Sequence, residues 1–130
     1  MYKQALKTAF SYLLILAAGL GTGYAAVRAP DWFKSPYTEG NYSQHYAAAG
    51  KQIVVYGTQT CPFCAKTREY LAGKKINFAD LDVNHDKQAG KRFKEMGGKA
   101  VPVILIGNRR IDGFNEKAIE EALQKAQKPV

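Results

Sequence analysis

Apolar and polar positions divide the chain into three stretches. Residues 9–27 carry no charged side chain and contain a long apolar run, Phe10–Leu20. Residues 28–50 mix turn-forming residues with aromatic ones and show no sustained periodicity. From Lys51 onward, short apolar runs alternate with polar, periodic segments. The pattern predicts an N-terminal segment over 1–27, a linker over 28–50 and one compact domain over 51–130.

Within 51–130 the pattern predicts four strands and three helices in the order β-α-β-α-β-β-α. Gly73 and Gly97-Gly98 are expected to end the first two helices, and Asn84 and Asn115 to cap the second and third. Gly107-Asn108 is a two-residue hairpin signal. Tyr56 is interpreted as a core residue of the first strand. The expected strands cover 53–56, 76–83, 103–106 and 109–112, and the expected helices 62–72, 84–96 and a last segment after 115.

The N-terminal segment resembles a membrane anchor or a secretory signal peptide. Nineteen uncharged residues in a helix reach about 28 Å, close to the thickness of a bilayer's hydrocarbon core. Small residues near Gly23 and Ala25 would suit signal cleavage instead. Lys3 and Lys7 precede the run, so the positive-inside tendency predicts a cytoplasmic N-terminus and an exported domain, periplasmic in a Gram-negative bacterium. Trp32-Phe33 then falls where interfacial aromatics occur.

Charge and cysteine content exclude several classes of function. The formal net charge is +8, and from Lys51 onward fifteen Lys and Arg stand against nine Asp and Glu. These basic residues are scattered, without an Arg-rich or aromatic-interleaved run, so we expect no nucleic-acid partner. Two cysteines cannot staple a small disulfide scaffold or complete a zinc site alone. We expect no bound metal or prosthetic cofactor, and a monomer.

The two cysteines, Cys61 and Cys64, lie at the start of the first predicted helix. Free amides and the helix dipole there stabilise a thiolate, so Cys61 is the expected nucleophile. Cys64 lies within reach and can resolve a mixed disulfide. Pro62 suits a first-turn position. Two other interpretations stay open: half of a metal site shared with another chain, and a pair of structural thiols.

Val101-Pro102 precedes the third strand. A proline entering a buried strand cannot donate to the ladder. A cis peptide bond there would turn the Val101 backbone outward to pair with an extended ligand. An ordinary trans proline is the commoner case for a single sequence.

Cys61-Pro62-Phe63-Cys64 resembles the active site of glutaredoxins, and Val101-Pro102 resembles their cis-proline loop. The resemblance covers about Lys51 to Lys128. It implies a thioredoxin-like α/β fold with a four-stranded mixed sheet ordered 2-1-3-4. It also implies a thiol–disulfide oxidoreductase that reduces protein disulfides or glutathione mixed disulfides, with glutathione as co-substrate. The binding residues it implies are Pro62, Phe63, Lys99, Val101, Pro102, Gly113, Phe114 and Asn115.

Three departures from the family pattern bear on glutathione. Thr58 stands where many glutathione-binding members have Lys, and Ala100 replaces the usual Thr before Val-Pro. Gly113-Phe114-Asn115 lacks the frequent acidic residue and is similar to redoxins that use thioredoxin reductase. A redoxin independent of glutathione is therefore one alternative. A tethered metal or iron–sulfur module is the other, although a proline at position 62 disfavours cluster binding in the family.

Overall fold

The computed structural model describes the backbone of residues 2–32 and 35–128, and the side chains of residues 2–20 and 35–128. By its internal contacts the chain forms two units, Met1–Ser35 and Pro36–Val130. The structure therefore has two units where the sequence predicted three segments, because most of the expected linker belongs to the second unit.

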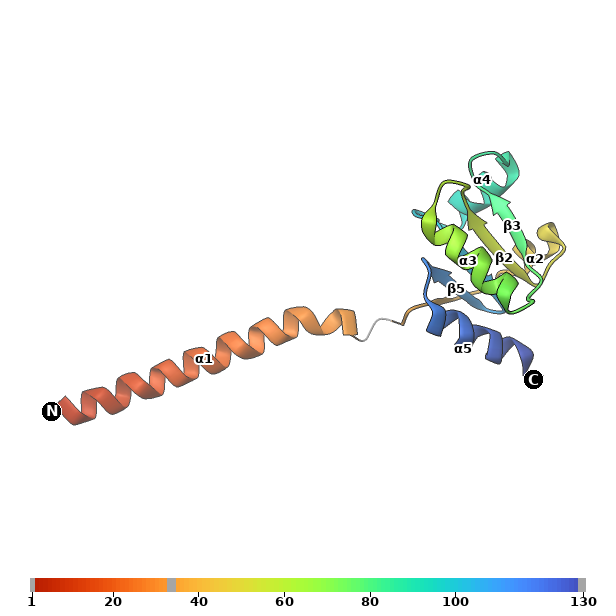
Figure 1. Cartoon of the computed structure of the whole chain (residues 1–130). Helices are drawn as coiled ribbons and strands as arrows, with labels where there is room; N and C mark the ends of the chain where they lie inside the picture. The colour runs from red at the N-terminus through yellow and green to blue at the C-terminus, as the bar shows by residue number, and fades with distance from the viewer. Residues whose placement is uncertain (1, 33–34, 129–130) are drawn as a thin grey trace. The chain divides into compact units, whose positions relative to one another are not determined.

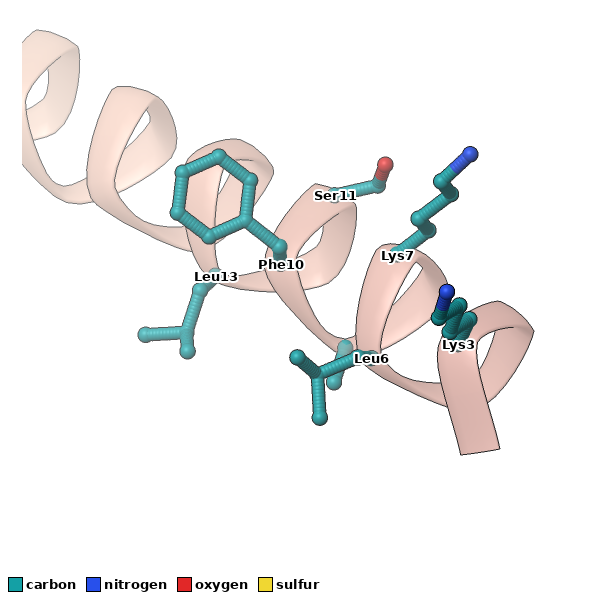
Figure 2. Close-up of a pocket in the computed structure, with 7 residues that line it drawn as sticks. Lys3, Leu6, Lys7, Phe10, Ser11 and Leu13 are labelled. Carbon is teal, nitrogen blue, oxygen red and sulfur yellow. The ribbon is translucent and has the colours of Figure 1, made fainter. Parts of the chain in front are cut away.

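The first unit is a single helix, α1 (Tyr2–Trp32). Its large apolar side chains up to Leu20 are exposed. Figure 2 shows Leu6 and Leu13 projecting to one side of the helix, and Lys7 and Ser11 to another. In the portion of the chain that the structure describes, no helix has the length and apolarity needed to cross a membrane. That finding does not support the predicted membrane span over residues 9–27. The side chains of residues 21–27, and those of Trp32 and Phe33, lie outside the described residues.

The second unit contains a five-stranded mixed sheet ordered β1-β5-β4-β2-β3. Strand β2 pairs parallel with β3 and antiparallel with β4, and β5 pairs antiparallel with both β4 and β1. The predicted 2-1-3-4 order is confirmed for the four strands β3, β2, β4 and β5. The elements are β1 (Thr38–Glu39), α2 (Ser43–Ala49), β2 (Ile53–Gly57), α3 (Pro62–Gly73), β3 (Ala79–Asp82), α4 (Lys87–Glu95), β4 (Val103–Ile106), β5 (Arg109–Asp112) and α5 (Glu116–Gln127).

Both faces of the sheet are covered, so the central strands β2 and β4 are almost wholly buried (Figure 1). Alternate residues of each strand point to opposite faces. Val55 and Ile104 pack with α3 and α5 on one face, while Val54 and Leu105 pack with α4 on the other. Tyr56 is fully buried on the second face, as predicted. The sheet therefore holds the carboxyl end of β2, where the cysteines follow, in a rigid frame.

The stretch 36–50 is folded, which corrects the predicted linker and the predicted number of strands. Its aromatic residues explain the difference, because they bury their rings on the domain. Tyr46 packs on the core and its hydroxyl donates to the Gly107 carbonyl at 2.8 Å. His45 is 8% exposed, and its Nδ1 lies 2.8 Å from the Tyr56 hydroxyl. These contacts hold α2 on the sheet, and β1 extends the sheet beyond β5.

Helix α4 begins later than predicted because a different residue caps it. The Asp86 carboxylate accepts from the backbone N–H groups of Gln88 and Ala89, at 2.9 and 3.0 Å. Asn84 instead belongs to the preceding turn, where its N–H donates to the Asp82 carboxylate. Strand β3 is also shorter than predicted. The cap at Asn115 is confirmed, since its Oδ1 accepts from Ala118 N–H at 3.0 Å.

Candidate active site

Cys61 is the N-cap residue of α3. Strand β2 ends at Gly57, and a three-residue turn leads to Cys61, which has extended backbone angles. The Cys61 Sγ accepts a hydrogen bond from the backbone N–H of Cys64 at 3.2 Å. Pro62 follows at the first helical position, where a missing N–H costs nothing. The predicted placement of Cys61 at a helix N-terminus is confirmed.

The environment of Cys61 favours its thiolate form. Burial by itself raises the pKa of the Cys61 thiol, because it disfavours the charged form. Hydrogen bonds from the Cys64 side chain and from the N–H groups of Cys64 and Phe63, together with the charge of Arg68, outweigh burial and lower the pKa below its usual value. Cys61 also remains partly exposed. A partly exposed thiol with a lowered pKa is the state expected of a nucleophile.

Cys64 has the opposite character. Its side chain is fully buried, and burial followed by the neighbouring Cys61 raises its pKa to about 11. Both cysteines are free thiols. A Cβ on Gly57 would stand 3.1 Å from the Cys64 Sγ, so glycine at the end of β2 makes room for this sulfur. The two thiols thus differ in exposure and acidity, which is the asymmetry that an attacking and a resolving cysteine require.

Arg68 belongs to this site, although its sequence position alone did not single it out. Its Nη2 donates to the Thr58 carbonyl at 3.0 Å and its Nε to the Asp80 carboxylate at 2.7 Å. The arginine thereby ties the turn before Cys61 to α3 and β3. The available signal was its spacing: Arg68 lies four residues after Cys64, one helical turn along α3.

The Val101-Pro102 peptide bond is cis, as the family resemblance implied. The loop lies against the cysteines, since the Cys61 Sγ is 3.8 Å from the Val101 carbonyl oxygen. Gly113, with φ of 84°, donates its N–H to the Pro102 carbonyl at 2.8 Å. The structure therefore brings Cys61, the cis-proline loop and the turn at Gly113 together.

The remaining predicted binding residues lie in four different places. Lys99, Val101 and Gly113 line one cavity of about 440 Å³, together with Arg110 and Asp112. Phe63 is 56% exposed beside the cysteines. Phe114 packs edge-on against Tyr70, in a different hollow. Asn115 uses its side chain to cap α5, so its Oδ1 is already occupied.

The described residues offer no metal centre. Among the segments of the chain that the structure describes, no three His, Cys, Asp or Glu side chains lie close enough to hold an ion.

Comparison with known proteins agrees with this geometry. The glutaredoxin family model matches residues 53–111. The chain is 39% identical over 74 residues to a glutaredoxin-like 8.6 kDa protein from the rubredoxin operon of Clostridium pasteurianum, covering 56% of this chain and 99% of that protein. It is 31% identical over 67 residues to glutaredoxin 3 of Escherichia coli, covering 49% of this chain and 78% of the relative.

Solved structures show the same fold. A thioredoxin-like protein matches with a TM-score of 0.54 and 25% identity, over 57% of this chain and 96% of its own. Glutaredoxin 1 of Archaeoglobus fulgidus matches with a TM-score of 0.53 and 24% identity, over 65% of this chain and 96% of its own. Because the C. pasteurianum relative is matched along nearly its whole length, the chain belongs to the glutaredoxin family.

Proposed function

We propose that this protein reduces disulfide bonds through Cys61 and Cys64, with protein disulfides as its main substrates. The observation that carries the proposal is the asymmetry of the two thiols. Cys61 is accessible and favours the thiolate, whereas Cys64 is buried with a raised pKa. Membership of the glutaredoxin family supports the same chemistry.

The reaction has two exchange steps. The Cys61 thiolate attacks one sulfur of the substrate disulfide, forms a mixed disulfide and releases the other sulfur as a thiolate. The Cys64 thiol then gives its proton to the thiolate released in the first step and attacks the Cys61 Sγ. This breaks the mixed disulfide and releases the second substrate sulfur as a thiolate. The products are a Cys61–Cys64 disulfide and a substrate reduced by two electrons. An external thiol reductant returns the pair to the dithiol form.

The cis-proline loop is proposed to hold the substrate during the first step. The Val101 backbone lies beside the Cys61 Sγ, where it would pair with an extended segment on either side of a substrate cysteine. Glutathione is proposed as a weakly bound co-substrate through Lys99, Val101 and Gly113. Because Thr58 stands where many members of the family have Lys, the site has one cation fewer to pair with the carboxylates of glutathione.

The test is reduction of insulin disulfides by the purified protein with dithiothreitol as electron source. The wild type is expected to accelerate the reaction, and Cys61→Ser is expected to abolish the acceleration. Ala65→Ser is a control on the same helix with an exposed side chain. Activity in Cys61→Ser equal to the wild type would reject the proposal.

We also propose that the N-terminal segment exports the domain. The supporting observations are Lys3 and Lys7 in the first turns of α1 and the exposed apolar side chains that follow them in the same helix. A phosphatase reporter active only outside the cytoplasm, fused after Val130, is expected to be active. An inactive reporter with a stable fusion would refute export. Carbonate extraction then distinguishes a retained anchor from a domain released by signal cleavage.

A further inference from the structure

A cavity of about 270 Å³ is formed where α2 begins and α4 ends. Tyr42 and His45 line it from the side of α2, and Arg92, Glu95 and Met96 line it from the side of α4. Residues 41–45 precede the part of the chain matched by the glutaredoxin family model, 53–111. Family membership therefore does not imply this cavity, and its ligand has to be inferred from its own side chains.

Arg92 brings a positive charge to the cavity that no acidic side chain compensates. Its Nε is buried and has no hydrogen-bond partner. The carboxylate of Glu95, one turn along α4, lies instead 3.8 Å from the Lys91 Nζ. The guanidinium also approaches the hydroxyl of Tyr56, whose pKa burial raises, so this neighbour is neutral. An uncompensated guanidinium beside a cavity is a binding group for anions, and its planar fork matches a carboxylate.

His45 adds a group that senses an anion. Its side chain is buried, and its Nδ1 is engaged with the Tyr56 hydroxyl at 2.8 Å. The other groups that face its ring are Tyr42, whose ring centroid is 6.2 Å away, and the Arg92 guanidinium. Burial, followed by the charge of Arg92, lowers the pKa of His45. An anion in the cavity would oppose both causes by favouring the charged imidazole.

The remaining walls restrict the anion further. The ring of Tyr42 and the thioether of Met96 offer apolar surface to a hydrocarbon portion. The Glu95 side chain is 62% exposed and would repel a second negative charge on the ligand. We propose that this cavity binds a small organic monocarboxylate, with its carboxylate on Arg92 and a short hydrocarbon chain against Tyr42 and Met96. The site is independent of the dithiol chemistry at Cys61 and Cys64.

The test titrates the full-length protein with butyrate, and separately with its neutral amide butyramide, at constant ionic strength. The ring-proton NMR resonances of the two histidines are followed. Butyrate is expected to bind in the millimolar range that a ligand of this size allows, to move the His45 resonance and to raise the pKa of His45. Butyramide is expected to do neither, and His85, in the exposed turn after β3, is expected not to respond. Inorganic phosphate is expected to bind about fivefold more weakly than butyrate, because it has no hydrocarbon to bury.

Arg92→Gln is expected to weaken butyrate binding about tenfold, the size of a charge-assisted hydrogen bond. Lys94→Gln is the matched control, because it removes an equal charge from an exposed position of the same helix outside the cavity, and it is expected to change the affinity by less than about twofold. Cys61→Ser is expected to bind butyrate as the wild type does, and loss of binding there would place the ligand at the cysteines and overturn the proposal.

Equal responses of His45 to butyrate and butyramide would overturn the proposal, and that comparison in the wild type needs no variant. Equal weakening in Arg92→Gln and Lys94→Gln would also overturn it, since net charge alone would then explain the binding. Phosphate binding as tight as that of butyrate would reject the monocarboxylate as the ligand class.

Discussion

Arg68 offers a direct test of how the site activates its nucleophile. Its guanidinium stabilises negative charge at Cys61 and ties the preceding turn to β3. Replacing Arg68 with Gln removes the charge and keeps a side chain that can donate a hydrogen bond. We expect the pKa of Cys61 to rise, so that the pH profile of its alkylation by iodoacetamide shifts to higher pH and the rate at about pH 6 falls.

The size of the effect follows from the exposure of the pair. The Arg68 side chain is 24% exposed and Cys61 is partly exposed, so solvent screens the interaction between the guanidinium and the thiolate. An interaction of this kind contributes on the order of 0.5–1 kcal/mol, which corresponds to a decrease of about two- to fivefold in thiolate fraction. At a pH well above the pKa of Cys61 in both proteins, the two are expected to react at similar rates, because Cys61 is then a thiolate in both.

Asp80→Asn is the matched control for Arg68→Gln. It breaks the same ion pair but leaves the arginine charge less compensated, so alkylation at about pH 6 is expected to stay equal or become faster. The alkylation rate is measured by mass spectrometry on the reduced protein. An unchanged rate in Arg68→Gln would refute the electrostatic role. An equal decrease in both variants would show that the pair acts only by supporting the turn.

Three further predictions concern the resolving thiol, glutathione and the added helix. Cys64→Ser should keep some activity on glutathione mixed disulfides and lose most activity on protein disulfides, because external glutathione can complete only the first reaction; equal loss in both coupled assays would contradict this division of roles. Thr58→Lys should tighten glutathione binding by about 1 kcal/mol in a calorimetric titration, and an unchanged affinity would show that no carboxylate lies near this position. Burial, then the charge of Arg92, lowers the pKa of His45 from its usual 6.5, so its contribution to stability is present above that value and is lost as the pH falls below it. The free energy of unfolding in urea should therefore decrease in acid, and less so in His45→Gln; equal decreases would assign the effect to other groups.

The core of the fold was predictable because its local signals agree with one another. The β-branched run at 53–56, the glycine stop at Gly97 and the hairpin at Gly107-Asn108 each specify one element. Gly73 is instead the last residue of α3, and Lys75 adopts the left-handed conformation after it. The strand predicted at 53–56 is confirmed as β2, which extends one residue further to Gly57. The strand order implied by the family resemblance is confirmed for β3, β2, β4 and β5. Asn84 was the wrong cap because Asp86, two residues later, offers its carboxylate to two amides.

The added strand and helix could not be predicted, because tertiary contacts create them. Helix α2 has seven residues, too few to form alone, and it is stabilised by burial of His45 and Tyr46 on the sheet. Strand β1 has two residues and exists only through pairing with β5. Composition indicated a linker because turn-forming residues surround these aromatics.

The positions of the two cysteines could be predicted from the sequence, whereas the roles of the residues around them could be predicted less well. A two-cysteine motif at a strand–helix junction specifies its own geometry, so Cys61 and Cys64 lie where the sequence placed them. Asn115 and Arg68 show which features of the site the sequence does not specify. Whether a polar side chain caps a helix or faces a ligand depends on its rotamer, and Arg68 joins the site only through contacts with Thr58 and Asp80.

The separate roles of Cys61 as nucleophile and Cys64 as resolving thiol are tested most directly by trapping the reaction intermediate. Reduced wild type and Cys64→Ser are each mixed with an oxidised peptide, quenched with acid and analysed by mass spectrometry. We expect the wild type to end as an internal Cys61–Cys64 disulfide with reduced peptide released, and Cys64→Ser to accumulate the peptide on Cys61. Peptide attached to Cys64 in a Cys61→Ser variant at a comparable rate, or no adduct on Cys61, would contradict the account.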